Sequence, residues 1–421
     1  EEWRGRWIGV RLKKCFSIES KIWSHTNHTL NSIHKKKLEN KNTQLSSHQL
    51  HQNNSKFTLI LNFTMNILSI LTCFAAFIVA SAQTNTPAAA ASTSNKKYKF
   101  TYSWKTESTL LVPRSDASAT PTQTSIIIAG GCIGKQSYQD WGGYGCDTIT
   151  DKVSVFNPLD GKCTATASMP RARYRHTAVN VANKIYLLGG TNLDYPEPVL
   201  AEIDVFDIKI SKWSTLPTNL NLPFATTDPA SFVIDSKIYF TGGYETTNYT
   251  AFSKTWCLDV NNIDAGWKSV AAAPTERGDA VGVTINGAGY VFGGFTHYNE
   301  FSEPVGTLES YSPVDNKWTT LKAMPTARGD KAGAVLHDRF HVIGGETKDK
   351  KGNSVPISDV EVYDPVEKTW QDEGKIPSER FRFMAAALDN VIYIFGGQKF
   401  LIGTPGASDS YYPVSDQIEA F

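Results

Sequence analysis

Arginine and aspartate recur at two positions of the sequence with a nearly constant spacing. The first position holds Arg114, Arg173, Thr226, Arg277, Arg328 and Arg380. The second position, two residues later, holds Asp116, Arg175, Asp228, Asp279, Asp330 and Arg382. A guanidinium group binds carboxylates and sulfates through two parallel hydrogen bonds, and it also pairs with carboxylates that hold protein segments together. The residue types therefore leave two interpretations open, namely ligand binding and structural ion pairs.

These two positions belong to a longer internal repeat. Each copy has a short apolar run that ends in two glycines, and the first glycines of the six pairs are Gly130, Gly189, Gly242, Gly293, Gly344 and Gly396. Their spacings are 59, 53, 51, 51 and 52 residues. A tryptophan occupies a common later position in four copies, at Trp213, Trp267, Trp318 and Trp370. β-Branched and aromatic runs between turn residues predict four short strands in each copy.

The repeat resembles the kelch repeat of the extracellular, galactose-oxidase-like superfamily, and the resemblance covers residues 98–421. It implies an all-β fold, specifically a six-bladed kelch-type β-propeller. Two copies depart from the pattern, because Cys163 and Ile418 stand at the tryptophan position of the first and last copies. Three residues follow Ile418, which are too few for an outer strand. We therefore expect an N-terminal strand around Trp104 to complete the sixth blade and close the ring, which also removes two exposed sheet edges.

The resemblance also implies a functional face, formed by the strand starts and the long loops that follow the glycine pairs. Because residues two apart in a strand point to one side, we expect both arginine-containing positions near the central mouth. Arg175 and Arg382 replace an acid there and are the best candidates for ligand contact. The full set of predicted ligand-binding residues is Arg114, Arg173, Arg175, Arg277, Arg328, Arg380, Arg382, Tyr195 and Tyr298. The alternatives are that the arginines pair with aspartates of neighbouring blades and that the loop aromatics pack on one another.

Enzymes with related propellers provide two alternative functions. Copper radical oxidases need histidine and tyrosine ligands and a further domain, whereas His176, His297, His337 and His341 are the histidines left after residue 82. We therefore expect no metal and no cofactor. A sugar-acid mutarotase or epimerase needs a general acid or base and an arginine at the mouth. No motif marks such an enzyme, and we assign no catalytic residue.

The N-terminal part differs from the repeat in composition. The chain has 421 residues with 42 Lys+Arg and 41 Asp+Glu. Residues 1–64 hold 11 of the basic residues and 4 of the acidic ones, and they have no hydrophobic period. They are interpreted as a basic, unstructured leader or as sequence upstream of the true start. Residues 65–82 are predicted to be a signal peptide or a signal anchor, and residues 83–97 a linker rich in Ala, Ser and Thr.

Export from the cytoplasm leads to two further predictions. Cys132 and Cys146 lie at the two ends of one loop and are expected to form a disulfide. Asn248 begins a glycosylation sequon on a displayed loop. The propeller segment is acidic overall, which argues against nucleic-acid binding. The predicted protein is secreted or surface-tethered, contacts a membrane only through a possible N-terminal anchor, and binds an extracellular protein or glycan at its arginine-containing face.

Overall fold

The computed structural model describes residues 103–138, 144–192, 199–245, 250–297, 303–399, 401–403 and 410–421. The chain separates into two units, Glu1–Tyr98 and Lys99–Phe421, and every described residue belongs to the second unit. The predicted leader, signal or anchor segment and linker lie outside the described residues. Within the described part of the chain, no helix is both long and apolar enough to span a bilayer.

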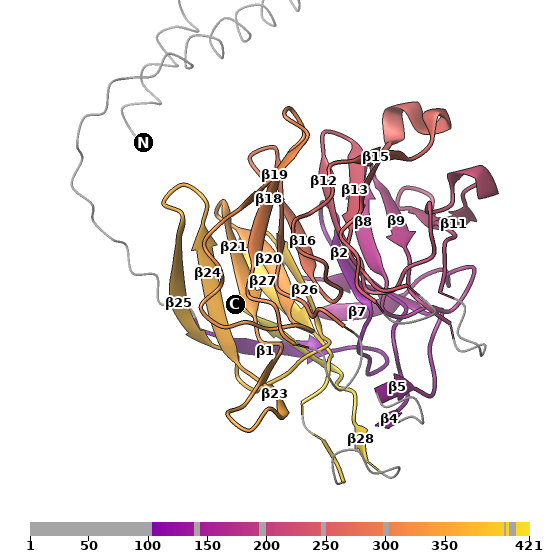
Figure 1. Cartoon of the computed structure of the whole chain (residues 1–421). Coiled ribbons are helices and arrows are strands. Elements are labelled where there is room, and N and C mark those ends of the chain that lie inside the picture. Colours follow the sequence, from indigo (N-terminus) through magenta and orange to yellow (C-terminus); the bar gives the residue numbers. More distant parts are fainter. Residues whose placement is uncertain are drawn as a thin grey trace, which may run out of the picture. The chain divides into compact units, whose positions relative to one another are not determined.

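Six four-stranded antiparallel sheets, called blades 1 to 6 in chain order, account for most of the described residues (Figure 1). Blade 1 contains β2 (Ser118–Pro121), β3 (Ile126–Ala129), β6 (Val153–Asn157) and β7 (Lys162–Ala165). Blade 2 contains β8 (Thr177–Val181), β9 (Lys184–Leu188), β10 (Asp204–Asp207) and β11 (Lys212–Thr215). Blade 3 contains β12 (Ala230–Ile234), β13 (Lys237–Thr241), β14 (Thr255–Asp259) and β15 (Lys268–Val270).

The other three blades repeat this arrangement. Blade 4 contains β16 (Val281–Ile285), β17 (Ala288–Phe292), β18 (Leu308–Ser312) and β19 (Lys317–Thr320). Blade 5 contains β20 (Ala332–Leu336), β21 (Arg339–Ile343), β24 (Asp359–Asp364) and β25 (Thr369–Lys375). Blade 6 contains β26 (Met384–Leu388), β27 (Val391–Phe395), β29 (Gln417–Ala420) and β1 (Lys105–Thr109).

Short elements lie between the blade strands. The loops contain β4 (Gln136–Tyr138), β5 (Tyr144–Cys146), β22 (Glu346–Lys348), β23 (Ser354–Pro356), β28 (Tyr411–Tyr412) and the 3-10 helices η1 (Thr218–Leu220) and η2 (Val260–Ala265). β28 pairs with β4, which joins the loop of blade 6 to that of blade 1. Figure 1 shows β4, β5, β23 and β28 together on the lower side of the blades.

The first strands of the six blades surround a common centre. β2, β8, β12, β16, β20 and β26 each contact the first strands of the two neighbouring blades. The second strands are apolar and almost fully buried, as in β3, because a neighbouring blade covers each of their faces. The outermost strands such as β7 are largely exposed. The predicted all-β propeller is confirmed.

The glycine pairs lie where the second strand of each blade leaves the sheet. Gly130 and Gly131 adopt φ angles of 67° and 101°. A Cβ atom on Gly131 would lie 2.6 Å from the main-chain oxygen of Ser115. A side chain is therefore excluded both by the left-handed backbone and by the close approach of the next segment.

The tryptophans pack between neighbouring blades and form hydrogen bonds from one blade to the next. In each of four blades the indole Nε1 donates to a main-chain carbonyl of the preceding copy, at 2.8–3.0 Å. The donors are Trp213, Trp267, Trp318 and Trp370, and the acceptors are Ala167, Leu220, Ala271 and Lys322. Each tryptophan therefore fills apolar space and satisfies a carbonyl group at the same time.

Blade 6 combines the two ends of the propeller segment. β1 pairs with β29, with Lys105 opposite Ala420, and Figure 1 shows the indigo β1 beside the C-terminal strands. Trp104 packs on Phe421 with a distance of 4.8 Å between ring centroids, which resembles the 5.0 Å between Phe206 and Trp213 in blade 2. The N-terminal strand thus supplies the tryptophan of the last blade.

Two expectations for blade 6 are wrong. Ile418 lies in the third strand β29 and not at the tryptophan position, because β1 provides the outer strand and Trp104 with it. The dipeptide Tyr412–Pro413 matches the turn position of the repeat, which places Tyr412 at the end of the third strand, but Tyr412 lies instead in β28 and pairs with Gln136 of blade 1. Cys163 does lie at the tryptophan position of blade 1, opposite Phe156.

Candidate functional site

The five arginines of the first position are buried inside the blades, with at most 1% of their surface exposed. Each guanidinium donates from Nη1 to the carbonyl oxygen of the first glycine of its own blade, sixteen residues later, at 2.9–3.3 Å. The pairs are Arg114 with Gly130, Arg173 with Gly189, Arg277 with Gly293, Arg328 with Gly344, and Arg380 with Gly396. The arginine thus donates a hydrogen bond to a carbonyl group that has no partner in the sheet because the chain turns away there.

Four of these arginines also face a carboxylate on the third strand of the same blade. The N–O distances are 2.5 Å for Arg173–Asp204, 2.7 Å for Arg277–Glu309, 3.0 Å for Arg328–Glu361 and 2.8 Å for Arg380–Glu419. Blade 3 has neither partner, because Thr226 replaces the arginine and Trp256 occupies the register position of the acid. In blades 2 to 6 the arginine and its carboxylate partner are therefore either both present or both absent.

The prediction that the first-position arginines lie at the mouth is wrong. It concerns Arg114, Arg173, Arg277, Arg328 and Arg380. The residues of the second position all have φ angles of 48–56°, so the chain is not extended there and the alternation of a strand does not apply. The first-position side chains consequently point into the blades and are not accessible to a ligand. The sequence analysis does not predict their acidic partners, although a signal for them exists. Four copies carry an acid on the third strand, and blade 3, which lacks the arginine, also lacks the acid.

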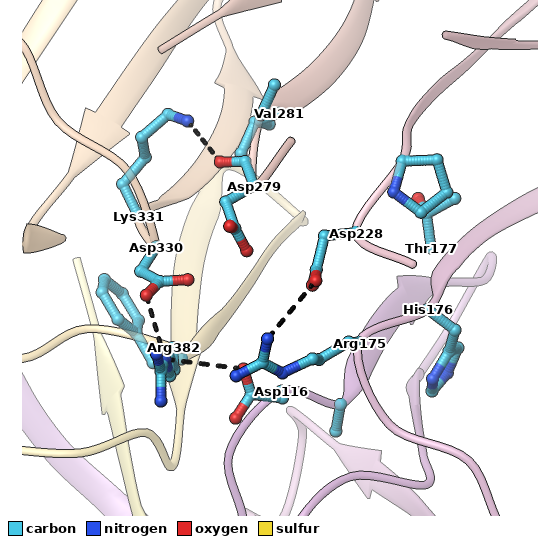
Figure 2. Close-up of a pocket in the computed structure, with 14 residues that line it drawn as sticks. Asp116, Arg175, His176, Thr177, Asp228, Asp279, Val281, Asp330, Lys331 and Arg382 are labelled. Carbon is cyan, nitrogen blue, oxygen red and sulfur yellow. Dashed lines mark hydrogen bonds and ion pairs between the residues drawn. The ribbon is translucent and has the colours of Figure 1, made fainter. Parts of the chain in front are cut away.

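The residues of the second position line a cavity of about 170 Å³ at the centre of the blades (Figure 2). Main-chain amides connect neighbouring members at 2.7–3.2 Å. The bonds run from the amide of Asp116 to the carbonyl of Arg382, from Arg175 to Asp116, from Asp228 to Arg175, from Asp279 to Asp228, and from Arg382 to Asp330. Between blades 4 and 5, Lys331 Nζ donates to the carbonyl oxygen of Asp279 at 3.0 Å.

Ion pairs between neighbouring blades cross this cavity. Arg382 Nε lies 2.9 Å from Asp330 Oδ2 and 3.9 Å from Asp116 Oδ1. Arg175 Nη1 lies 3.7 Å from Asp228 Oδ2. Figure 2 shows both guanidiniums directed toward these carboxylates. Arg175 and Arg382 are therefore at the mouth as predicted, but their charges are matched by aspartates of adjacent blades, so the cavity does not carry an excess of positive charge.

Burial shifts the protonation of the carboxyl groups in the cavity. It raises the pKa of Asp228 to about 7, although Arg175 acts in the opposite direction. It raises the pKa of Asp279 well above its usual range, and the nearby charges of Asp228 and Asp330 act in the same direction. Burial also opposes ionisation of Asp330, but Arg382 and Arg175 outweigh it and lower the pKa of that group.

Two basic groups lie beside these carboxyls. Burial lowers the pKa of Lys331 to about 7, with Arg277 acting in the same direction. Burial likewise lowers the pKa of His176 to about 3, and its Nε2 is 3.0 Å from the hydroxyl of Ser118. Asp228 and Lys331 therefore both change protonation near neutral pH within one cavity, which is a property that acid–base chemistry and cation binding can both use.

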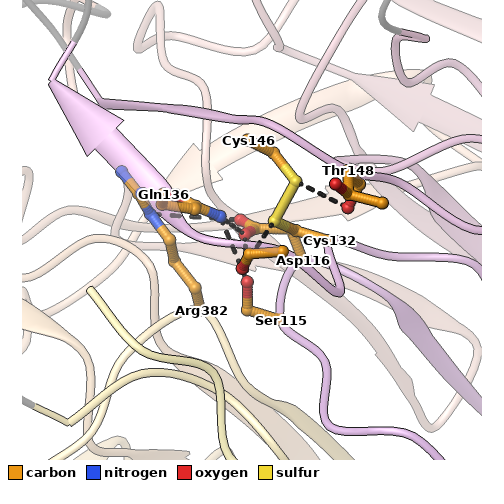
Figure 3. Close-up of a disulfide and its surroundings, with 8 residues drawn as sticks. Ser115, Asp116, Cys132, Gln136, Cys146, Thr148 and Arg382 are labelled. Atoms are coloured by element: carbon orange, nitrogen blue, oxygen red, sulfur yellow. Dashed lines mark hydrogen bonds and ion pairs between the residues drawn. A yellow bond between two sulfur atoms is a disulfide. The ribbon is translucent and has the colours of Figure 1, made fainter. Parts of the chain in front are cut away.

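The predicted disulfide between Cys132 and Cys146 is present (Figure 3). It ties the start of the loop that carries β4 to the end of β5. In β4 the buried Gln136 donates from its side-chain amide to Asp116 and to Ser115 Oγ, the latter at 3.1 Å, and its carbonyl oxygen accepts from Arg382. Gln136 thus belongs to the hydrogen-bonded group of Asp116 and Arg382 at the mouth, a role that nothing in its sequence position indicates.

Several predicted positions lie outside the described residues. These are the loop tyrosines Tyr195 and Tyr298 and the sequon residue Asn248. Among the residues that the structure does describe, no group of three or more His, Cys, Asp or Glu side chains is arranged to hold a metal ion.

Comparison with known families identifies the repeat. The KLHDC2/KLHL20/DRC7 Kelch-repeats domain matches residues 105–271 and 175–397. The chain belongs to this Kelch-repeat family. The matched residues extend from β1 to the glycine pair of blade 6 and end before β29.

Curated kelch proteins share about a quarter of their aligned residues with this chain. Kelch-like protein terF of Aspergillus terreus is 26% identical over 295 residues, which are 68% of this chain and 61% of that protein. Human Kelch-like protein 23 is 26% identical over 217 residues, which are 51% of this chain and 36% of that protein. The chain thus spans less than two thirds of the length of either relative.

A solved structure shares the kelch propeller fold. The structure of YjhT superposes with a TM-score of 0.58 at 14% sequence identity, covering 74% of this chain and 96% of that one. At this level of identity the likeness concerns the fold alone.

Proposed function

We propose that this kelch protein is a protein-binding module whose mouth cavity receives a basic side chain of its partner. The observation that carries the proposal is the surplus of carboxyl groups in the cavity. Four aspartates, Asp116, Asp228, Asp279 and Asp330, face two guanidiniums, Lys331 and His176, and burial lowers the pKa of His176 to about 3, so this ring is neutral at neutral pH. The carboxyl groups therefore outnumber the basic groups that can carry a charge, and burial favours the protonated form of Asp279 until a cation lies next to it.

Asp279 is the expected contact for an incoming cation. Its carboxylate forms no ion pair among the described residues, and it accepts a hydrogen bond from Tyr244 at 2.9 Å. A guanidinium or ammonium group brought next to it stabilises the ionised form, which burial disfavours in the free protein. The cavity of about 170 Å³ has the space of about six waters at roughly 30 Å³ each, enough for the end of a lysine or arginine side chain.

The disulfide favours an extracellular location for this binding. Disulfides persist in oxidising compartments, and the Cys132–Cys146 bond agrees with the apolar segment predicted at residues 65–82 as a signal peptide or anchor. We propose that the propeller is secreted or tethered to the outer cell surface. Removal of N-linked glycans from the expressed protein is expected to increase its mobility on a gel, and an unchanged mobility after substitution of Asn248 would contradict glycosylation there.

A sugar-binding or sugar-isomerising site is the second candidate. Asp228 and Lys331 both have pKa values near 7, which suits a general acid and base. A glycan array and an anomer-exchange assay by NMR with uronic and sialic acids test this alternative. Turnover that disappears in Asp228→Asn would favour the enzyme over the binding module.

The proposed protein-binding function is tested with a peptide library. One fixed position carries Lys, Arg, Glu or Gln among randomised residues, and binding to the intact protein is compared with Asp279→Asn. We expect selection of Lys or Arg and a loss of at least about 30-fold in Asp279→Asn, because a desolvated charge pair contributes about 2 kcal/mol or more. The matched control is Asp389→Asn, in the hairpin at the opposite end of β26. Selection of acidic residues, or equal binding by the two variants, would contradict the proposal.

A further inference from the structure

Arg114 of blade 1 differs from the other buried arginines in its charge environment. It makes the same carbonyl contacts, with Nη1 at 2.9 Å from Gly130 and 3.1 Å from Lys152. The register position of the acid, opposite Ile128 on β3, is held by Ser154. Among the described residues Arg114 forms no ion pair, and its buried Nη2 has no hydrogen-bond partner. One arginine of the five therefore lacks the carboxylate that the other four have.

Within the part of the chain that the structure describes, no neighbouring group supplies the missing negative charge. Burial lowers the pKa of Arg114 to about 10, so the guanidinium remains charged at neutral pH. Cys163 is the titratable group that acts on it, and burial raises the pKa of this thiol to about 11, so the thiol remains neutral. A buried charge without a counter-charge is strongly unfavourable in a folded protein.

The other blades show how this cost is avoided. Blade 3 lacks the acid and also lacks the arginine, because Thr226 stands in its place. Blade 1 lacks only the acid. The side chains around the missing acid are also smaller than in blade 2. Ser154 stands where blade 2 has Asp204, and its cross-strand neighbour Ala165 on β7, which is exposed, stands where blade 2 has Thr215. Blade 1 therefore combines an unmatched guanidinium with smaller side chains at the positions that Asp204 and Thr215 fill in blade 2.

We propose that a chloride-sized monovalent anion binds in blade 1 between Arg114 Nη2 and Ser154, in place of the carboxylate found in four other blades. The Ser154 hydroxyl donates to the anion, and Arg114 provides the charge. Chloride is the physiological ligand of this chemistry, and bromide is its experimental substitute. The site lies inside the blade and is distinct from the mouth cavity.

Thermal unfolding of the full chain tests the site. Sodium chloride and sodium bromide are compared with sodium gluconate at equal ionic strength. We expect a saturable increase of about 4 °C in Tm with either halide, since an anion that binds only the folded state stabilises it. In Ser154→Glu, which restores the carboxylate, the halide response should disappear and Tm in gluconate should rise. The matched control Ser154→Gln fills the space without charge, and should lose the response without the rise in Tm.

Bromide anomalous scattering in crystals of the unaltered protein is independent of how the variants fold. The proposal predicts an anomalous peak within contact distance of Arg114 Nη2 and none beside Arg173, Arg277, Arg328 or Arg380, which have carboxylates. It is overturned if the peak is absent. It is equally overturned if Ser154→Glu keeps the halide response of the unaltered protein.

Discussion

Buried arginine–carboxylate pairs are the repeated polar unit of this propeller. In each of the four pairs the arginine binds the carbonyl of a turn glycine and a carboxylate of the third strand, as Arg328 does with Gly344 and Glu361. A single side chain thus connects the start of the first strand with the second and third strands. The pairs are not expected to add much stability relative to an apolar replacement, because desolvation offsets the Coulomb attraction. They specify where the three segments meet.

Breaking one pair on one side is therefore expected to be costly. Glu361→Gln leaves Arg328 buried without a counter-charge, and we expect a decrease of about 3–5 kcal/mol in the free energy of unfolding. Urea denaturation measures this decrease. The double variant Arg328→Met, Glu361→Leu removes both charges, as blade 3 does naturally, and should be less destabilised than Glu361→Gln. If the decreases in the free energy of unfolding caused by Arg328→Met and by Glu361→Leu add up to that of the double variant, the two side chains do not act as a pair.

Asp228 is expected to make stability depend on pH. Its pKa is about 7 in the folded protein and about 3.8 when exposed, so the folded state binds more protons between these values. Stability from this group is complete below about pH 4 and is lost as the pH rises through 7. Asp228→Asn should therefore show a smaller decrease in Tm between pH 4 and 7 than the unaltered protein. The control Asp389→Asn should keep the original dependence, and identical profiles for all three proteins would refute the assignment.

At the scale of elements, the β4–β5 hairpin connects a disulfide to the mouth. Cys132 and Cys146 are 14 residues apart, β4 pairs with β28 of the loop of blade 6, and Gln136 contacts Asp116 and Arg382. Figure 3 shows the disulfide beside these side chains. The covalent bond thus orders a segment that joins blades 1 and 6 on the mouth side.

Loss of this disulfide is expected to destabilise the protein by about 3 kcal/mol, the value for a closed loop of about 15 residues. Cys146→Ser should lower Tm, and reductant should lower the Tm of the unaltered protein to the same value. Cys163→Ser, which removes a free thiol, should leave the response to reductant unchanged. If reductant has no effect on the melting curve of the unaltered protein, the hairpin does not depend on the disulfide.

At the scale of the whole propeller, the two ends of the segment meet in blade 6. Because Lys105 lies opposite Ala420 and Trp104 packs on Phe421, the start of β1 is adjacent to the end of β29. The outer strand of the last blade therefore comes from the opposite end of the chain. Leu110, just after β1, is buried in the core between blades 6 and 1.

This geometry predicts that a circular permutant folds. The permuted chain begins at residue 112, runs to Phe421, and continues through Asn-Gly into residues 104–110, which makes β29 and β1 a two-residue hairpin. We expect cooperative unfolding with a Tm at or above that of the original chain, measured by circular dichroism. Deletion of residues 103–110 should abolish the cooperative transition. Cooperative unfolding of the deleted chain at the original Tm would show that β1 is dispensable.

Much of the fold could be predicted from the sequence because it depends on local repetition. The glycine pairs, the tryptophans and the apolar runs each mark a position that every blade needs, and they recur with the period of the blade. Blade 6 was harder to predict, because its third strand follows a long loop and lacks the turn residues of the other copies. For this reason Ile418 and Tyr412 were placed incorrectly, whereas the N-terminal strand was placed next to the right blade.

The site was predictable only in part. Arg175 and Arg382 were identified because they interrupt a column of aspartates, and both line the cavity. The five first-position arginines were misplaced because the left-handed backbone at the second position cannot be read from residues that are not glycine. Gln136 was missed because its contact with Arg382 joins residues 246 positions apart.

The sequence by itself determined the number of repeated units, the kelch resemblance and the pairing of Cys132 with Cys146, because each depends on residues that are close together or spaced by a fixed period. Only the tertiary structure decided which charges meet. Whether an arginine serves a ligand or the fold depends on its burial and on the carboxylate placed beside it by strand register. These quantities arise from packing between segments, so the cavity of aspartates and the unmatched Arg114 became visible only in three dimensions.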